Sequence, residues 1–305
     1  MSDTDFRLAA FGWLTQQVDF HGDVLPWAML AWGFEHRGER VPLLSQQGIF
    51  KPRVMDLPLS MRTSVSGPYD DSFGSDGLLR YRYRGTDPEH RDNVGLRTAM
   101  REKAPLAYFH GVAKGKYLAV WPVYVVGDDP GGLAFSVAVD DSKISMELLK
   151  RNEAAGMVEE YDSSSRRRYV TALVRQRLHQ RTFREKVLRA YREQCALCRL
   201  RHTELLDAAH IIPDVEERGE PEVSNGLSLC KLHHAAFDAL FLGVTPEYRI
   251  EVQPRILKEK DGPMLLHGLQ ELHRKKIVVP RGRRMRPDPS RLEERYGRFL
   301  AAAGG

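Results

Sequence analysis

The chain contains three cysteines, and their spacing, together with one histidine, could hold a metal ion. Cys195-Ala196-Leu197-Cys198 is followed later by Cys230-Lys231-Leu232-His233. Two residues separate the outer members of each pair, and such a tight turn lets both side chains reach one ion. Thiolates and an imidazole suit a closed tetrahedral Zn²⁺ site, and the odd number of cysteines argues against a disulfide framework. We therefore predict a structural zinc site, and the alternative is a set of reduced, buried thiols.

A second group of polar side chains lies between the two pairs. His210 falls within the apolar segment 205–212, and Asn225 stands before the next apolar segment, 226–230. Hydrolysis of a phosphodiester needs a base to deprotonate water, a divalent ion to offset negative charge, and a group that holds the base in place. His210 could be this base and Asn225 the group that orients it. The alternative for a single histidine on an apolar strand is a hydrogen-bonded core residue.

The divalent ion would be bound by residues that follow the second cysteine pair. His234 and Asp238 are four residues apart, so on a helix they share one face and both can reach one ion.

The combined pattern resembles that of HNH (ββα-metal) endonucleases that carry a zinc cluster. The resemblance rests on three motifs, which are Ala209-His210-Ile211-Ile212-Pro213, Asn225-Gly226-Leu227-Ser228-Leu229-Cys230 and His233-His234-Ala235-Ala236-Phe237-Asp238. It implies that His210 is the general base, that Asn225 orients the base and its loop, and that His234 binds the catalytic Mg²⁺ or a similar ion. Asp238 occupies the place of a frequent second helix ligand, whereas Ala209 stands where many members carry a first-strand ligand. Asp207 shares the strand face of Ala209 but lies one pleat back, about 7 Å along the strand. It is a candidate ligand if the strand bulges or the ion is shifted.

These residues must be positioned by a β-hairpin followed by a helix. One strand would end at His210, a second would follow Asn225, and the helix would carry His234 and Asp238. The preceding segment, 166–194, contains no glycine or proline and has apolar residues at helical spacing. It is therefore predicted to form one or two basic amphipathic helices.

Basic residues flank the motif on both sides. The formal net charge is +5, and arginine and lysine dominate segments 166–201 and 274–298. Neutralisation of phosphates supplies most of the sequence-independent affinity of proteins for DNA. Double-stranded DNA is therefore the predicted partner, and the alternative for each run is a solvated helix face.

The N-terminal half has a different pattern of apolar and turn-forming residues. Helix-like apolar segments, 6–18 and 25–34, come first, and they could serve packing or form a lid. Short β-like runs follow at 78–83, 107–111, 116–126 and 133–139, separated by turn-rich sequence. This pattern predicts a β-rich domain and makes the whole chain an α+β protein.

The N-terminal half also resembles the SRA (SET and RING-associated) domain, which flips a modified cytosine into a pocket. The resemblance rests on Ser66-Gly67-Pro68-Tyr69-Asp70-Asp71, Tyr83-Arg84-Gly85, Asp92-Asn93-Val94-Gly95-Leu96, Tyr117 and 120–126. A flipped base needs aromatic faces and an acceptor for its amino group. Tyr69 and Tyr83 could stack on the base, and Asp70 or Asp71 could accept. The alternative is a type I turn and two core tyrosines in a sheet.

We therefore expect four segments. They are a β-rich SRA/PUA-like domain over 1–155, a basic helical linker over 156–185, a small zinc-stapled ββα-metal (HNH) domain over 186–280 and a basic C-terminal tail over 281–305. No apolar run approaches the roughly 18–20 residues needed to cross a bilayer, and the acidic start, 1–5, lacks the basic residues of a signal peptide. A cytoplasmic protein without a membrane partner is the expectation.

The two resemblances together imply a modification-dependent restriction endonuclease, of the type IV or IIM kind. It would recognise 5-methylcytosine or a related base by base flipping and cut DNA at a single-metal HNH site. Cutting both strands with a single-metal module generally requires two active sites, so a homodimer is expected. The alternatives are an HNH endonuclease for unmodified DNA and a zinc-stapled DNA-binding protein without catalysis.

Overall fold

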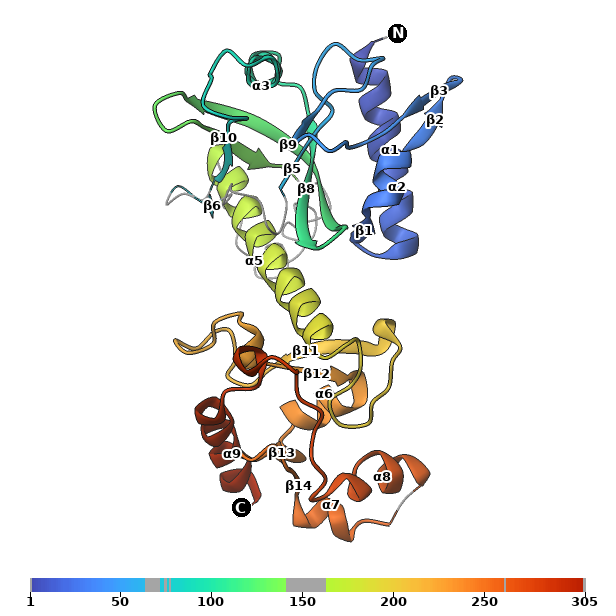
Figure 1. The fold of residues 1–305 in the computed structure, drawn as a ribbon, viewed down its shortest axis with the longest axis vertical. Coiled ribbons are helices and arrows are strands. Elements are labelled where there is room, and N and C mark those ends of the chain that lie inside the picture. Colours follow the sequence, from blue (N-terminus) through green and yellow to red (C-terminus); the bar gives the residue numbers. More distant parts are fainter. Residues whose placement is uncertain are drawn as a thin grey trace, which may run out of the picture. The chain divides into compact units, whose positions relative to one another are not determined.

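A computed structural model of the chain describes residues 2–63, 72–73, 76, 78–140, 163–260 and 262–303. The chain forms two compact units, Met1–Leu178 and His179–Gly305. Helix α5 (Ser163–Ala190) contains the boundary between them (Figure 1). The boundary thus lies inside the segment expected as a helical linker, whose residues 156–162 fall outside the described part. No helix in the described ranges has the length and apolar character needed to cross a membrane.

The N-terminal unit is built on one sheet. Its strands are β1 (Val24–Pro26), β4 (Ile49–Phe50), β5 (Ser60–Arg62), β6 (Ser72–Phe73), β7 (Leu79–Arg82), β8 (Leu106–Ala113), β9 (Lys116–Asp129) and β10 (Ala134–Val139). Their order is β4-β5-β8-β9-β10-β7-β6, with β1 also paired to β9. Strands β5 and β8 run parallel, and the other pairs are antiparallel. All four runs predicted as β-like from the sequence are strands, and the α+β class is confirmed.

Helices and a small hairpin complete this unit. They are α1 (Asp3–His21), α2 (Trp27–Trp32), the hairpin β2 (Phe34–His36) and β3 (Glu39–Val41), and α3 (Arg91–Arg101). Phe6, Ala10 and Leu14 of α1 recur at four-residue spacing and are fully buried in one apolar cluster with Leu30 of α2. Such spacing places them on one helix face. The first helices therefore serve packing, which was one of the two roles expected for them.

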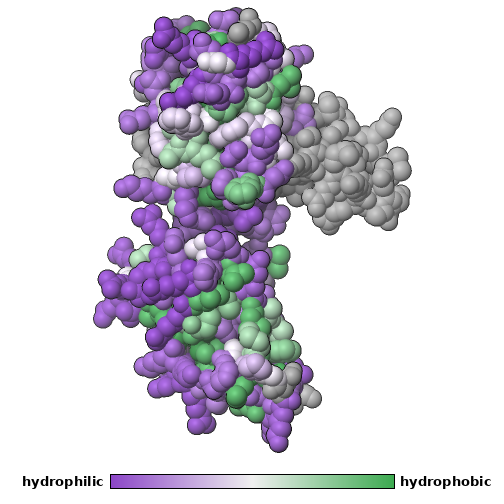
Figure 2. Space-filling view, turned by 90° about the vertical axis from the view of Figure 1, so that its right-hand side faces the viewer, coloured by the Kyte–Doolittle hydropathy of each residue, from purple (hydrophilic) through white to green (hydrophobic). Residues whose placement is uncertain are grey.

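The C-terminal unit consists mainly of short helices and strands. They are η1 (Thr203–Leu205), β11 (Leu206–His210), η2 (Val223–Asn225), β12 (Gly226–Cys230), α6 (Lys231–Asp238), β13 (Leu242–Val244), β14 (Ile250–Val252), α7 (Pro254–Lys258), α8 (Pro263–Gly268), η3 (Gln270–Leu272), η4 (Arg283–Met285) and α9 (Pro289–Ala303). Their core includes residues of the last turns of α5, such as Phe183 and Val187. Hydrophobic residues (green) also reach the visible face of this unit, among hydrophilic ones (purple), in Figure 2.

Helix α9 occupies most of the segment 281–305, which was expected as a basic C-terminal tail. Leu292 and Phe299 of this helix are buried, and they lie seven positions apart, hence on one helix face. A side chain on Gly243 of β13 would place its Cβ 2.8 Å from Cγ of Phe299, so the missing side chain lets α9 pack closely on β13 (Figure 1). The tail is therefore part of the C-terminal unit.

Candidate functional site

The site is carried by the hairpin β11–β12 and helix α6. The two strands are antiparallel, with Asp207 opposite Leu229 and His210 opposite Gly226. Helix α6 begins directly after β12, with Cys230 as its N-cap residue. The ββα order predicted from the sequence is thus present.

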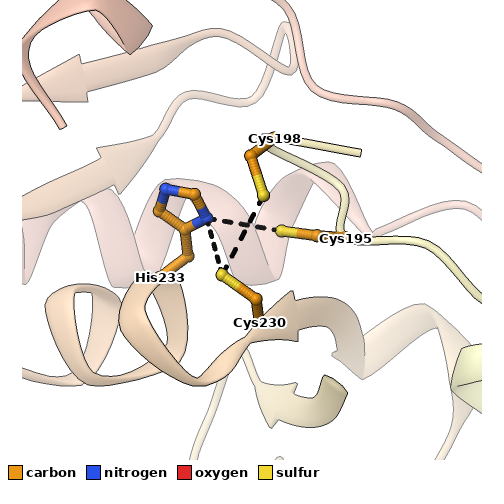
Figure 3. A group of neighbouring side chains, drawn as sticks. All are labelled: Cys195, Cys198, Cys230 and His233. Carbon is orange, nitrogen blue, oxygen red and sulfur yellow. Dashed lines mark hydrogen bonds between the residues drawn. The ribbon is translucent and has the colours of Figure 1, made fainter. Parts of the chain in front are cut away.

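The four predicted zinc ligands lie together at the start of α6 (Figure 3). Nδ1 of His233 lies 3.1 Å from Sγ of Cys230 and 3.4 Å from Sγ of Cys195. Sγ of Cys198 lies 3.9 Å from Sγ of Cys230. The four ligand atoms all lie within 4.8 Å of one another, and no other group of three or more potential ligands gathers in this way within the described ranges.

This geometry fits one tetrahedral ion. Bonds of about 2.0–2.3 Å to zinc put tetrahedral ligands roughly 3.4–3.8 Å apart, close to the separations found. Nε2–H of His233 donates to the carbonyl oxygen of Gly268 at 2.7 Å, which leaves the lone pair of Nδ1 for the ion. Cysteine binds metal as the thiolate, and three thiolates with one imidazole are a ligand set that suits zinc.

His210 ends β11 and packs against helix α5. Its ring stacks on that of Phe183, with centroids 4.1 Å apart and an interplanar angle of 17°. Gly226, opposite His210, allows this contact. A Cβ there would lie 2.5 Å from Cγ2 of Val187 and 2.9 Å from Cζ of Phe183.

The environment of His210 favours a neutral imidazole. Burial lowers its pKa from the ordinary value, with His234 adding to the effect, while Asp214 and Asp238 oppose it. Its Nε2 atom is buried and has no hydrogen-bond partner among the residues that the structure describes. A buried nitrogen without a partner is costly in a core residue, and a neutral imidazole can take up a proton. Both features favour a chemical role over that of a hydrogen-bonded core histidine.

Asn225 fixes the loop that follows His210. Its side chain is fully buried. Its Oδ1 accepts from the N–H of Ile212 at 2.9 Å, and its Nδ2 donates to the carbonyl oxygens of Ile212 at 2.9 Å and Glu220 at 3.2 Å. The backbone of Asn225 also accepts from the N–H of Ile211 at 2.9 Å. Asn225 therefore sets the path of the chain immediately after His210.

His234 lies between two carboxylates. Its Nδ1 is 3.7 Å from Oδ2 of Asp207, and its Nε2 is 3.3 Å from Oδ2 of Asp238. One imidazole and two carboxylates form a donor set that suits Mg²⁺ or a similar divalent ion. The two carboxylates approach different ring nitrogens, so these three side chains do not converge as closely as the zinc ligands do. Asp207, predicted to lie one pleat back, is brought to His234 and not to His210.

Two arginines beside these carboxylates were not singled out from the sequence. Nε of Arg184 lies 3.8 Å from Oδ1 of Asp207, and Nη2 of Arg295 lies 3.8 Å from Oδ1 of Asp238. Arg184 also donates to the carbonyl oxygens of Thr203 and Leu206, each at 2.8 Å. Both arginines belong to basic runs, and nothing in their local sequence separates them from their neighbours.

Three of the four residues predicted for the modified-base pocket lie outside the described part of the chain, namely Tyr69, Asp70 and Asp71. The pocket and the SRA-like nature of the N-terminal unit therefore remain predictions. The fourth residue, Tyr83, directly follows β7 and can be placed.

Tyr83 lies in the core of the N-terminal unit. Its exposed fraction is 1%, and its ring centroid lies 4.6 Å from that of Phe135. Its hydroxyl donates to the carboxylate of Asp128, which also accepts from Nε of Arg97 at 2.7 Å. This placement favours the alternative of a core tyrosine, because its ring is covered by protein.

Comparison with known proteins identifies the C-terminal motif. A family model described as HNH endonuclease (HNH_2) matches residues 195–245. No curated protein sequence matches the chain.

Two solved structures share a low level of similarity with the chain. The modification-dependent TagI restriction endonuclease is 15% identical, over 79% of this chain and 81% of that one, with a TM-score of 0.31. The type IV phosphorothioation-dependent restriction endonuclease ScoMcrA is 18% identical, over 59% of this chain and 45% of that one, with a TM-score of 0.22. TM-scores of this size do not define the fold of the N-terminal unit. The family match, in contrast, covers the β11–β12 hairpin, helix α6 and all four zinc-ligand residues, and residues 195–245 are an HNH endonuclease domain.

Proposed function

We propose that the chain is a DNA endonuclease that hydrolyses phosphodiester bonds at the HNH site. The observation that carries the proposal is the state of His210, a half-buried histidine with a lowered pKa and an unpartnered Nε2 at the end of β11. His210 would take the proton of the attacking water. Asn225 would keep the loop after the base in place through its bonds to Ile212.

The two metal sites would have separate tasks. Zinc on Cys195, Cys198, Cys230 and His233 would be structural, because all four ligands come from the protein and no coordination position stays open. A divalent ion such as Mg²⁺, bound by His234 and Asp238 with Asp207 as a further candidate, would supply positive charge against the phosphate and the leaving oxygen.

Basic residues of the C-terminal unit support DNA as the substrate. They are exposed and form no ion pair with another described residue, namely Lys186, Arg189, Arg192, Arg274, Lys275, Lys276, Arg281, Arg283 and Arg284. Exposed cations without acidic partners remain available to phosphates.

We further propose that the N-terminal unit reads 5-methylcytosine or a related base, which would make the protein a modification-dependent restriction endonuclease of the type IV or IIM kind. This part rests on the sequence resemblance to SRA domains and on Tyr69, Asp70 and Asp71. A homodimer would bring two active sites to the two DNA strands.

One comparison tests both parts. Methylated and unmethylated copies of one plasmid are incubated with Mg²⁺ and the wild-type protein, or with His210→Ala. We expect cleavage of the methylated copy by the wild type alone. Equal cleavage of the two copies would point to unmodified DNA as the substrate. Binding without cleavage, or unchanged cleavage by His210→Ala, would remove the catalytic proposal.

A further inference from the structure

Three arginines of helix α9 face the HNH domain. Arg291, Arg295 and Arg298 are spaced by four and three residues, so they share one helix face. The side chains of Arg291 and Arg295 are 12% and 11% exposed, and that of Arg298 is 35% exposed. This burial separates them from the exposed arginines that precede α9.

Two of these arginines bind the connection between His210 and Asn225. Arg298 donates to both carboxylate oxygens of Glu216 at 2.7 Å, and Nη2 of Arg291 donates to Glu220 at 2.6 Å. The connection, residues 211–224, is much longer than the few residues of a usual hairpin loop, so its path needs support from elsewhere.

The third arginine binds the end of helix α6. Nη2 of Arg295 donates to the carbonyl oxygen of Phe237 at 3.0 Å, and its guanidinium lies 4.8 Å from the centroid of the Phe237 ring. The same nitrogen is 3.8 Å from Asp238. A cation at the C-terminal end of a helix is favourable, and a buried guanidinium needs such acceptors.

We propose that α9 is a positioning element of the nuclease site, which holds loop 211–224 and the end of α6 in fixed relation through Arg291, Arg295 and Arg298. The loop follows the base His210, and the end of α6 carries Asp238. A helix bound to both therefore sets where the base stands with respect to the residues assigned to the divalent ion. The inference rests on the proposed nuclease function, and its residues act through the loop and α6 without contacting the substrate.

A double-mutant cycle on Arg298 and Glu216 tests the inference. Arg298→Gln, Glu216→Gln and the double variant are compared in the full-length protein. The control is Lys258→Gln, which also removes one positive charge, on an exposed residue of α7. Hydrogen exchange of residues 211–224, zinc content and cleavage rate are measured for each protein.

We expect each single variant to raise exchange in the loop and to lower kcat by on the order of 10- to 100-fold, as small misplacements of catalytic groups do. The double variant should be no worse than Arg298→Gln alone, because Arg298→Gln already removes the contact with Glu216, together with the hydrogen bond from Arg298 to Glu294. Zinc content and the behaviour of Lys258→Gln should match the wild type. Should Arg298→Gln lose zinc through misfolding, Arg291→Gln provides the same test at Glu220.

Unchanged loop exchange, or unchanged cleavage despite raised exchange, would overturn the inference. Additive losses in the cycle would also overturn it, because Arg298 would then act independently of the loop. Absence of cleavage in the wild type would instead remove the proposed function. The exchange data would still report whether α9 holds the loop.

Discussion

At the scale of single residues, two adjacent histidines of α6 face different surroundings. His233 is 1% exposed and its Nε2 is bound to Gly268, so its Nδ1 faces the three sulfurs. The side chain of His234 is 28% exposed and lies between Asp207 and Asp238. Neighbouring positions on a helix point about 100° apart, which allows one short helix to carry ligands for two centres.

The first prediction concerns the pH dependence of cleavage. Burial lowers the pKa of His210 from its ordinary value of 6.5, and the base works in its neutral form. The acidic limb of the kcat/KM profile should therefore lie below pH 6.5. Phe183→Ala exposes the ring and should move this limb towards higher pH. A wild-type limb at or above the ordinary value, or a limb that Phe183→Ala leaves in place, would contradict the assignment of His210 as the base.

The second prediction concerns the stability provided by Asn225. Asn225→Ala leaves the N–H and the carbonyl of Ile212 without their side-chain partner. Each buried polar group that loses its hydrogen-bond partner costs about 1–3 kcal/mol. Urea unfolding should show this loss, and cleavage should fall. Ser228→Ala is the matched control, because the hydroxyl of Ser228 is buried without a hydrogen-bond partner among the described residues. Equal effects of the two substitutions would remove the special role of Asn225.

The roles of these residues differ in how far the sequence could predict them. The cluster of Cys195, Cys198, Cys230 and His233 was predictable because two short motifs contain all four residues. The HNH residues lie within one segment and were assigned by their motif order. Arg295 could not be found in this way, because its partner Phe237 lies far away in the sequence and other arginines stand nearby, at positions 291 and 298.

At the scale of elements, helix α5 and the hairpin depend on Gly226. The third prediction is that Gly226→Ala lowers the free energy of unfolding by about 1–3 kcal/mol, because the added Cβ would overlap Val187 and Phe183. Gly297→Ala is the contrast, since Gly297 is an exposed residue of helix α9 with nothing within 4 Å of an added Cβ. It should stabilise the protein by about 0.5–1 kcal/mol. Chemical denaturation distinguishes the two outcomes. An unchanged free energy of unfolding in Gly226→Ala would show that Val187 and Phe183 of α5 can move away from the hairpin at little cost.

The elements also show where sequence patterns reach their limit. The runs 78–83, 107–111, 116–126 and 133–139 were predictable as strands, because apolar residues alternate or cluster between turns. Helix α9 did not stand out in the sequence, because its many charged residues obscure the two apolar positions, Leu292 and Phe299. These positions become a buried face only through tertiary packing, of Leu292 in the C-terminal core and of Phe299 against Gly243.

At the scale of the whole molecule, the two compact units should respond differently to zinc removal. The fourth prediction is that a zinc-selective chelator unfolds the C-terminal unit and leaves the N-terminal unit folded. The predicted zinc cluster ties segment 195–198 to the start of α6 and lies within the apolar core of the C-terminal unit, whereas the apolar clusters of the N-terminal unit contain none of the four ligands. Limited proteolysis, with fragments identified by mass, should show cleavage confined to residues after 178. Loss of both units together, or of neither, would contradict this expectation.

Helix α6 begins directly after Cys230, a predicted zinc ligand, and ends at Asp238, a residue proposed for the divalent ion. This shared helix implies an order of maturation. A newly synthesised chain would first have to acquire zinc before His234 and Asp238 could be presented on a folded α6. Cells short of zinc would then accumulate protein that cannot cut, even with abundant magnesium. The supply of one metal would thus govern the use of the other.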